Sequence, residues 1–243
     1  MEKVCPNGKK VCDCSPEELK QAKMKKKKKP PKVYKVKDPE PSQRFEDIHE
    51  NLPSMPSLLL IIGSVRSAKS NLICNLLMNP EMYKDMFDIV KVVSTTLHSC
   101  HKGKLLAKYF DADDHYNDNL IEEIKKSQSQ YEATERPTFC LVLDDVLTQD
   151  FSKSNAVSYF ATRFRHYIDM YIIATQSFRA VSGLIRNNAT DIIITKQQNQ
   201  KELMKIIEEY GSMFPSSDGA GDGEKNLMKM YLEAHKERFS FLY

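Results

Sequence analysis

An apolar run that leads directly into a phosphate-binding loop constrains this sequence more than any other feature. Residues 58–62 (LLLII) are continuously apolar, the next eight residues read GSVRSAKS, and helical spacing follows at Asn71–Met78. A continuous rather than alternating apolar run is typical of a strand buried on both faces, as in a parallel sheet covered by helices. We therefore predict a buried strand, a tight loop and a helix in immediate succession.

The loop matches the pattern G-x-x-x-x-G-K-[ST] at every defined position but one. In that pattern, backbone N–H groups surround the β-phosphate of a nucleotide, the lysine reaches the β- and γ-phosphates, and the hydroxyl ligates Mg²⁺. Gly63, Lys69 and Ser70 occupy their places, whereas Ala68 stands where the pattern has glycine. We therefore predict that ATP and Mg²⁺ bind here. The expected nucleotide-binding residues are Gly63, Ser64, Val65, Arg66, Ser67, Ala68, Lys69, Ser70 and Asn71.

The rest of the chain alternates between apolar runs and stretches with helical spacing. Further strands are predicted at Ile89–Val93, Phe139–Leu143, Met170–Ala174 and Ile192–Ile194, with a last candidate at Phe239–Tyr243. Helices are predicted at Leu120–Lys126, Asn155–Tyr167, Glu202–Tyr210 and near Lys225–His235, with a loop at residues 216–223. This alternation predicts one α/β domain over residues 45–243, with a mostly parallel sheet flanked by helices on both faces.

Two carboxylates follow the apolar run Phe139–Leu143. A phosphate-binding loop needs a carboxylate that helps to hold Mg²⁺ and, for hydrolysis, a group that polarises the attacking water. Ligands of α/β sheets bind at the carboxyl ends of the strands. We therefore assign Asp144 to Mg²⁺, together with Ser70, and Asp145 to the water.

Polar and basic residues around the run Met170–Ala174 are further candidates. Thr175 or Gln176, which end this run, could reach the γ-phosphate or the attacking water if the strand lies between the other two. Arg163 and Arg165 precede the run, and Arg179 and Arg186 follow it. An arginine supplied by a neighbouring subunit can stabilise charge in phosphoryl transfer. Any single one of the four is more often a surface ion-pair residue.

The first 44 residues form a basic arm, which we predict to lack regular structure. Residues 1–37 hold thirteen lysines against four acidic residues, so the remaining chain carries a net charge of about −6. The run of five lysines at 25–29 could bind nucleic acid, direct nuclear import or keep the protein in solution. Cys5, Cys12 and Cys14 fit no tetrahedral zinc pattern, and we expect free thiols.

No apolar run approaches the roughly 20 residues of a membrane-spanning helix, and no signal-peptide stretch follows the first residue. The six cysteines are irregularly spaced, which suits a reducing compartment. The sequence thus predicts a protein that is not secreted and has no transmembrane segment.

The ordered set of motifs resembles one known family. The set comprises residues 63–70 (GSVRSAKS), 141–145 (LVLDD), 163–166 (RFRH), 175–177 (TQS) and 185–188 (IRNN). In this order and spacing, over roughly residues 45–243, it is similar to the genome-packaging ATPases of nucleocytoplasmic large DNA viruses, a branch of the HerA/FtsK superfamily. The resemblance implies an additional-strand P-loop core, in which the sensor strand lies between the P-loop (Walker A) strand and the acidic (Walker B) strand.

The same resemblance implies a function. It implies an ATP-driven motor that moves double-stranded DNA into a preformed capsid as a homo-oligomeric ring. Capsid or portal-like vertex proteins would be its partners, and its location would be host cytoplasm at sites of virus assembly or the virion. Carried over by position, Lys69 binds the phosphates, Asp145 positions water and Gln176 is the sensor. Arg186 is the preferred arginine finger and Arg163 the second.

Ala68 keeps a second hypothesis open. A methyl group in place of the usual glycine must fit the dihedral angles of the loop and the phosphate that it faces. If it does not fit, the chain is a degenerate P-loop protein that binds nucleotide and has a scaffold or interaction role. A P-loop kinase or an ABC-type ATPase is less favoured, because neither an arginine-rich lid nor an LSGGQ-like stretch is recognisable.

Overall fold

The computed structural model describes residues 45, 48–132, 134–146, 155–215 and 222–243. The predictions for the basic arm, for Cys5, Cys12 and Cys14, and for most of the loop at 216–223 lie outside these residues. The arm and its boundary with the predicted ATPase domain therefore stay predictions.

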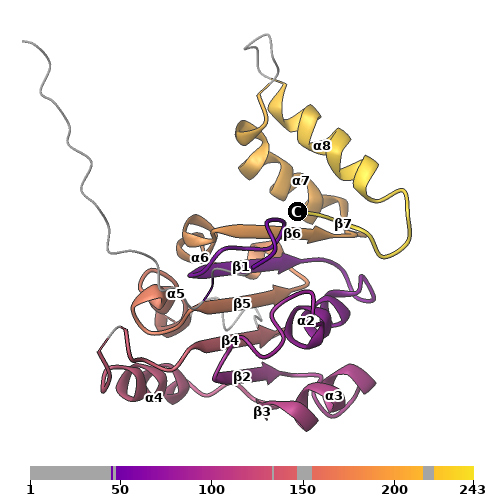
Figure 1. Ribbon diagram of the computed structural model, residues 1–243. Coiled ribbons are helices and arrows are strands. Elements are labelled where there is room, and N and C mark those ends of the chain that lie inside the picture. Colours follow the sequence, from indigo (N-terminus) through magenta and orange to yellow (C-terminus); the bar gives the residue numbers. More distant parts are fainter. Residues whose placement is uncertain (1–44, 46–47, 133, 147–154, 216–221) are drawn as a thin grey trace, which may run out of the picture. The chain divides into compact units, whose positions relative to one another are not determined.

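Within the described residues, seven strands form one sheet in the order β3-β2-β4-β5-β1-β6-β7 (Figure 1). The strands are β1 (Ser57–Ile62), β2 (Ile89–Ser94), β3 (Asp111–Asp113), β4 (Phe139–Asp144), β5 (Met170–Thr175), β6 (Asp191–Thr195) and β7 (Phe241–Leu242). All neighbours pair in parallel except β6 and β7, which are antiparallel. The predicted α/β fold is confirmed, and so is the position of β5 between the P-loop strand β1 and the acidic strand β4.

Helices cover both faces of this sheet. They are α2 (Lys69–Met78), α3 (His101–Tyr109), α4 (Asn119–Gln128), α5 (Asn155–Ala161), α6 (Gly183–Asn188), α7 (Gln200–Tyr210) and α8 (Gly223–Ala234). Three single 3-10 turns accompany them: η4 (Phe164–His166), η5 (Phe178–Ala180) and η6 (Gly211–Met213). In Figure 1, α7 and α8 stand beyond the β6 side of the sheet.

The alternation of side chains along β1 builds two hydrophobic cores. Leu59 and Ile61 pack in the cluster formed with α2 and α3, whereas Leu58 and Leu60 pack in the cluster formed with α4 to α8. Every side chain of β1 is fully buried, because successive residues of a strand point to opposite faces and both faces are covered. This explains why the run had to be apolar without interruption.

Three predicted elements differ from the observed ones. The helix predicted at Asn155–Tyr167 ends at Ala161, because Arg163 adopts φ −133° and ψ 3°, and the 3-10 turn η4 follows. The last strand is shorter than predicted, since only Phe241–Leu242 pairs with β6. The stretch around Arg186, for which the sequence predicted no element, is the helix α6, whose N-cap Ser182 accepts a hydrogen bond from the Ile185 N–H.

The sequence reading missed β3 and α3. The strand β3 is the polar tripeptide Asp111–Asp113, in which no apolar periodicity can be seen. It is held at the edge of the sheet by Lys91 of β2, whose Nζ lies 2.8 Å from a carboxylate oxygen of Asp111 and 2.7 Å from one of Asp113. Charged side chains are common on edge strands, because they discourage pairing with other chains.

Candidate functional site

Gly63, the first residue of the P-loop, packs closely against β6. The Gly63 N–H donates to the Thr175 carbonyl at 3.1 Å, and the Ser64 N–H donates to the Lys196 carbonyl at 3.1 Å. A Cβ atom on Gly63 would overlap with the hydroxyl of Thr195, which itself donates to the Ser67 hydroxyl at 2.7 Å. The strand-to-loop transition thus requires glycine.

Ala68, the departure from the motif, adopts a glycine-like backbone. Its φ of 75° and ψ of 13° lie in the left-handed region, and Arg66 also has a positive φ of 61°. Ala68 nevertheless begins α2, because its carbonyl accepts the Leu72 N–H at 2.9 Å. An L-residue in this region costs about 1–2 kcal/mol relative to its preferred conformation. The loop therefore keeps its shape, at the expense of strain that glycine would not carry.

Lys69 is buried at the start of α2, with 5% of its side chain exposed. Its Nζ donates to the carbonyls of Gly63 at 2.8 Å and Ser64 at 3.3 Å, and lies 3.9 Å from Asp145 Oδ1. Burial lowers the pKa of Lys69, whereas the negative charges of Asp145 and Asp144 oppose this effect. The ammonium is thus held over the loop, where a phosphate could replace the carbonyls in stronger, charge-assisted hydrogen bonds.

Asp144 is the most deeply buried carboxylate of the site, with a residue exposure of 1%. Its Oδ2 accepts hydrogen bonds from Ser70 Oγ at 3.2 Å and Ser94 Oγ at 3.1 Å, whereas its Oδ1 is buried without a hydrogen-bond partner. Burial, and then the charge of Asp145, raise the pKa of Asp144 to about 6, although both serine hydroxyls oppose the rise. The site therefore holds one unpartnered carboxylate oxygen beside the Ser70 hydroxyl.

These residues fit Mg²⁺. Carboxylate and hydroxyl oxygens are the ligands that Mg²⁺ prefers, and the ion usually takes only one or two carboxylates together with phosphates and water. Within the described part of the chain, no three His, Cys, Asp or Glu side chains form a metal-binding group of their own. Ser70 and Asp144 would therefore hold the ion only together with a nucleotide.

Asp145 and Gln176 meet across two neighbouring strands. Asp145 has a left-handed φ of 53°, and its N–H donates to the Ala174 carbonyl at 2.9 Å. Gln176 Nε2 donates to Asp145 Oδ2 at 2.9 Å, and Asp145 Oδ1 is buried without a hydrogen-bond partner. Thr175, the other candidate sensor, is buried and its hydroxyl bonds the Ser177 carbonyl at 3.2 Å. Gln176 is therefore the residue that reaches the acidic pair.

Ser94 is a site residue that the sequence reading missed. It ends β2 directly opposite Asp144 in the parallel register, and it is fully buried. The available signal was its position, since a polar residue ends the run Ile89–Val93 just as Asp144 ends its own run. Without the order of the strands, however, nothing indicated that these two ends were neighbours.

The candidate arginines do not contact the P-loop of their own chain in the described contacts. Arg186 Nε lies 2.7 Å from Glu209 Oε1, and its NH1 donates to the Val181 carbonyl at 2.7 Å. Arg163 lies over the Tyr159 ring and is exposed, as is Arg165. Arg179 is bound near the start of α7. A role in hydrolysis for any of them stays a prediction that requires a second subunit.

Comparisons with known proteins give one sequence relative and several structural likenesses. No known family profile matches the chain. Uncharacterized protein 075L of Invertebrate iridescent virus 6 is 28% identical over 165 residues, which cover 65% of this chain and 62% of that protein. The chain thus spans less than two thirds of the length of this relative. In the described residues, no helix has the length and apolar character needed to cross a membrane.

Two solved structures illustrate the likenesses. EssC (ATPases 2 and 3) from Geobacillus thermodenitrificans is 15% identical, with a TM-score of 0.49 over 62% of this chain and 34% of that chain. The genome packaging NTPase B204 from Sulfolobus turreted icosahedral virus 2, in complex with ATP-gammaS, is 16% identical, with a TM-score of 0.44 over 63% of this chain and 81% of that chain. Because both TM-scores lie below 0.5, we base the assignment of function on the residues of the site.

Asp144→Asn should stabilise the nucleotide-free protein above pH 6. In the wild type, the unfolded carboxyl ionises near 3.8 and the folded one near 6, so the folded state loses stability as pH rises between these values. The loss is up to about 3 kcal/mol. Urea unfolding at pH 4.5 and pH 7.5 should therefore show a larger advantage of the variant at pH 7.5. Asp85→Asn, at an exposed carboxylate, is the control, and its stability relative to the wild type should not differ between the two pH values. An advantage of equal size at both pH values would contradict the burial of an ionised Asp144.

Ala68→Gly should raise the free energy of unfolding by about 1 kcal/mol, because glycine adopts the left-handed region without strain. Gly183→Ala is the matched control: a methyl group there meets open space in the first turn of α6, so the opposite change should stabilise by about 0.4–1 kcal/mol. Nucleotide affinity of Ala68→Gly should change by less than about tenfold, that is 1.4 kcal/mol. A larger gain would favour the degenerate P-loop hypothesis.

Proposed function

We propose that this chain is an ATPase motor that hydrolyses ATP and moves double-stranded DNA. One observation carries the proposal: the order β4-β5-β1 brings Gln176, Asp145 and Lys69 together at the carboxyl ends of the strands, with contacts of 2.9 and 3.9 Å. A phosphate-binding lysine, a carboxylate and a side-chain amide in this arrangement are the groups that hydrolysis of a terminal phosphate requires.

Each residue of the site has a distinct role in this proposal. The backbone N–H groups of the loop and the start of α2 bind the phosphates, and Lys69 neutralises their charge. Ser70 and Asp144 hold Mg²⁺, which when bound offsets charge on the phosphates. Asp145 accepts a hydrogen bond from the attacking water through Oδ1, the carboxylate oxygen that has no hydrogen-bond partner. Gln176 holds the second oxygen of Asp145 and thereby fixes the orientation of the carboxylate.

Double-stranded DNA as the moved substrate, and packaging of a viral genome into a capsid, are the finer part of the proposal. The ordered motifs of residues 63–70, 141–145, 163–166, 175–177 and 185–188 support it. The relative from an iridescent virus is in keeping with a viral origin. In this proposal the chain acts as a homo-oligomeric ring, contacts capsid or vertex proteins, and works at sites of virus assembly in the host cytoplasm or in the virion.

The second candidate is a nucleotide-binding P-loop protein with a scaffold role. Ala68 is the observation that favours it, since the left-handed backbone there carries strain. Two distances count against it. Lys69 Nζ lies 3.9 Å from Asp145 Oδ1, and Gln176 Nε2 donates to Asp145 Oδ2 at 2.9 Å. ATP binding by the wild-type protein without any turnover, with or without DNA, would favour this candidate.

Lys69→Ala should reduce ATP turnover by about 100-fold or more, because it removes the ammonium that stabilises the transferred phosphate. The measurement is ATP hydrolysis by the full chain, with and without duplex DNA, over a range of protein concentrations. Asp145→Asn should still bind Mg-ATP but turn it over slowly. Lys84→Ala, a half-exposed lysine in the turn after α2, is the control. Undiminished hydrolysis by Lys69→Ala would show that the P-loop is not the site of turnover.

Arg186→Ala should bind ATP but hydrolyse it about 1000-fold more slowly if this arginine serves the site of a neighbouring subunit. Because Arg186 pairs with Glu209 in its own chain, Glu209→Ala is the matched control that breaks the same ion pair and keeps the arginine. Mixing Arg186→Ala with Lys69→Ala should restore part of the activity, since some sites in mixed rings would be intact. No recovery despite co-assembly, or full activity of Arg186→Ala, would leave Arg163 as the next candidate.

A further inference from the structure

A groove with mostly basic walls lies between η5 and α7. It is lined by Arg179, Gln200, Lys201, Met204, Lys205 and Glu208, that is, by three cations and one carboxylate. The side chain of Arg179 is 56% exposed, and that of Lys205 43%. Lys205 and Glu208 form an exposed ion pair at 3.4 Å, and pairs of this kind in solvent are weak. The cations of the groove therefore remain available to an anionic ligand.

Glu202, a further carboxylate on α7, already accepts hydrogen bonds from η5 and its N-cap residue. Its Oε1 accepts a hydrogen bond from Ser177 Oγ at 3.2 Å, and its Oε2 accepts one from the Arg179 N–H at 3.3 Å. The guanidinium of Arg179 is farther away, with Nε 3.9 Å from Glu202 Oε1. Glu202 thus ties η5 to the start of α7 and leaves most of the Arg179 side chain in solvent.

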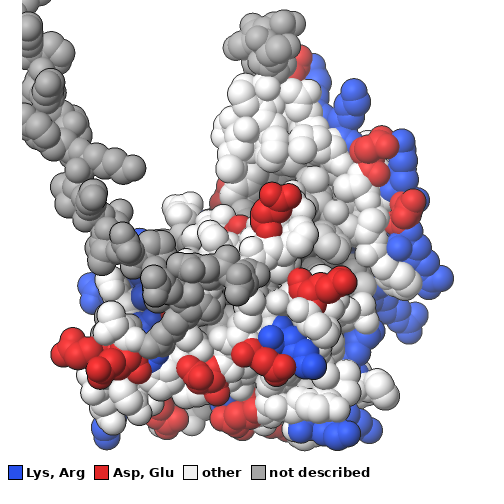
Figure 2. All heavy atoms as spheres, viewed as in Figure 1, with Lys and Arg blue, Asp and Glu red and all other residues white. Residues whose placement is uncertain are grey.

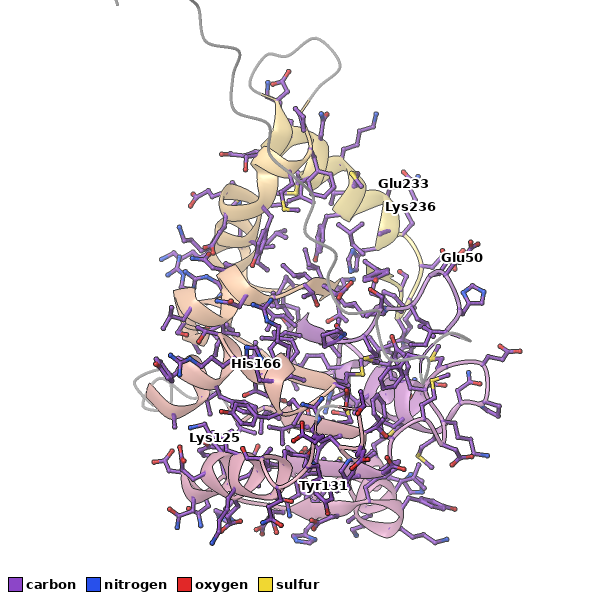
Figure 3. All side chains as sticks on the ribbon, turned by 60° about the vertical axis from the view of Figure 1, so that its left-hand side comes forward. Glu50, Lys125, Tyr131, His166, Glu233 and Lys236 are labelled. Atoms are coloured by element: carbon purple, nitrogen blue, oxygen red, sulfur yellow. The ribbon has the colours of Figure 1, made fainter. Side chains whose placement is uncertain are left out.

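Other lysines close to this groove lie in and beside α8. Figure 2 shows a column of basic side chains along the α8 side of the molecule, with carboxylates among them. Lys225 lies 2.6 Å from Asp222, and Lys236 lies 2.6 Å from Glu233, the pair labelled in Figure 3. Lys225 and Lys236 are thus exposed cations with a carboxylate partner, as Lys205 is, and they provide a comparison surface for the groove.

The residues that precede each wall of the groove form hydrogen bonds with residues of the candidate nucleotide site. On the η5 side, Arg179 follows Gln176, which donates to Asp145 at 2.9 Å. On the α7 side, the Gln198 N–H donates to the hydroxyl of Ser64 in the P-loop at 2.8 Å. A ligand in the groove would consequently touch the two segments that also contact the phosphate loop and the acidic pair.

We infer that this groove binds the phosphate backbone of double-stranded DNA. The inference rests on the proposed function, because that function supplies the polyanion. Lys201 and Lys205 lie one turn apart on the same side of α7, and Arg179 faces them from η5, so several phosphates of one strand can be contacted together. Outside residues 1–37 the chain carries a net charge of about −6, which makes a local cluster of cations the preferred place for an anion. Contacts to phosphate position DNA without reading its sequence.

The test compares two triple variants of the full chain. Arg179→Ala with Lys201→Ala and Lys205→Ala should weaken binding of a random duplex at least about tenfold at moderate salt. The plot of log affinity against log salt should become shallower by about two to three, since each phosphate contact contributes about 0.9 to the slope. Lys225→Ala with Lys229→Ala and Lys236→Ala removes the same number of charges from α8 and the turn after it, and should change affinity by less than about twofold. Thermal melting checks that both variants are folded.

Each other outcome overturns the inference or separates it from the proposed function. Wild-type affinity and salt slope in the groove variant would overturn it, and so would an equal loss in the α8 variant. Preference for polyglutamate over duplex DNA would assign the groove to an acidic protein. A wild-type protein that hydrolyses ATP but binds no duplex DNA would also overturn it. DNA binding through the groove without any ATP turnover would contradict the proposed ATPase activity but support the assignment of the groove to DNA.

Discussion

The parallel pairing of β1 with β5 and β6 is the constraint on which the site depends. Ile62, the last residue of β1, stands opposite Thr175 on one side and Ile194 on the other. On the far side of β5, Asp144 stands opposite Ala174 and Ser94. This register brings the ends of β2, β4, β5, β1 and β6 to one edge of the sheet. The predicted phosphate loop, the acidic pair and Gln176 therefore lie together there. A shift of β5 by one residue would turn its side chains to the other face of the sheet.

The hydrophobic cores of this sheet offset the free-energy cost of burying charged groups at the site. Asp144 and Lys69 are both buried. Burial raises the pKa of Asp144 and lowers that of Lys69, which in each case favours the neutral form. Neighbouring charges and hydroxyls compensate only in part, because one carboxylate oxygen of Asp144 has no hydrogen-bond partner. Fully buried residues such as Leu60 contribute about 1.5–3 kcal/mol each and offset this cost. In the proposed function, phosphates and Mg²⁺ would supply the partners that these buried groups lack.

The sequence was sufficient for the main strands and for most of the site, but not for contacts between elements. Continuous apolar runs identified β1, β4 and β5 because both faces of these strands are buried. The motif located Lys69 and Ser70, and the strand end located Asp144. Ser94 depended on strand order, which no local pattern carries. The strand end alone left Thr175 and Gln176 open, and only the family resemblance named Gln176. The edge strand β3 lacks an apolar side, and its ion pairs with Lys91 could not be seen in one dimension.

The hairpin of α7 and α8 is joined to the phosphate loop by hydrogen bonds of its own. The Ser64 hydroxyl donates to the Gln197 side-chain oxygen at 3.2 Å, and the Gln197 N–H donates to the Tyr231 hydroxyl of α8 at 2.7 Å. Tyr231 is buried in the same cluster as β1. A change in the position of Ser64 would therefore strain buried hydrogen bonds in the hairpin, and a buried polar group that loses its partner costs about 1–3 kcal/mol. Because α7 also carries one wall of the basic groove, these bonds link the predicted phosphate-binding loop to the surface that we assign to DNA.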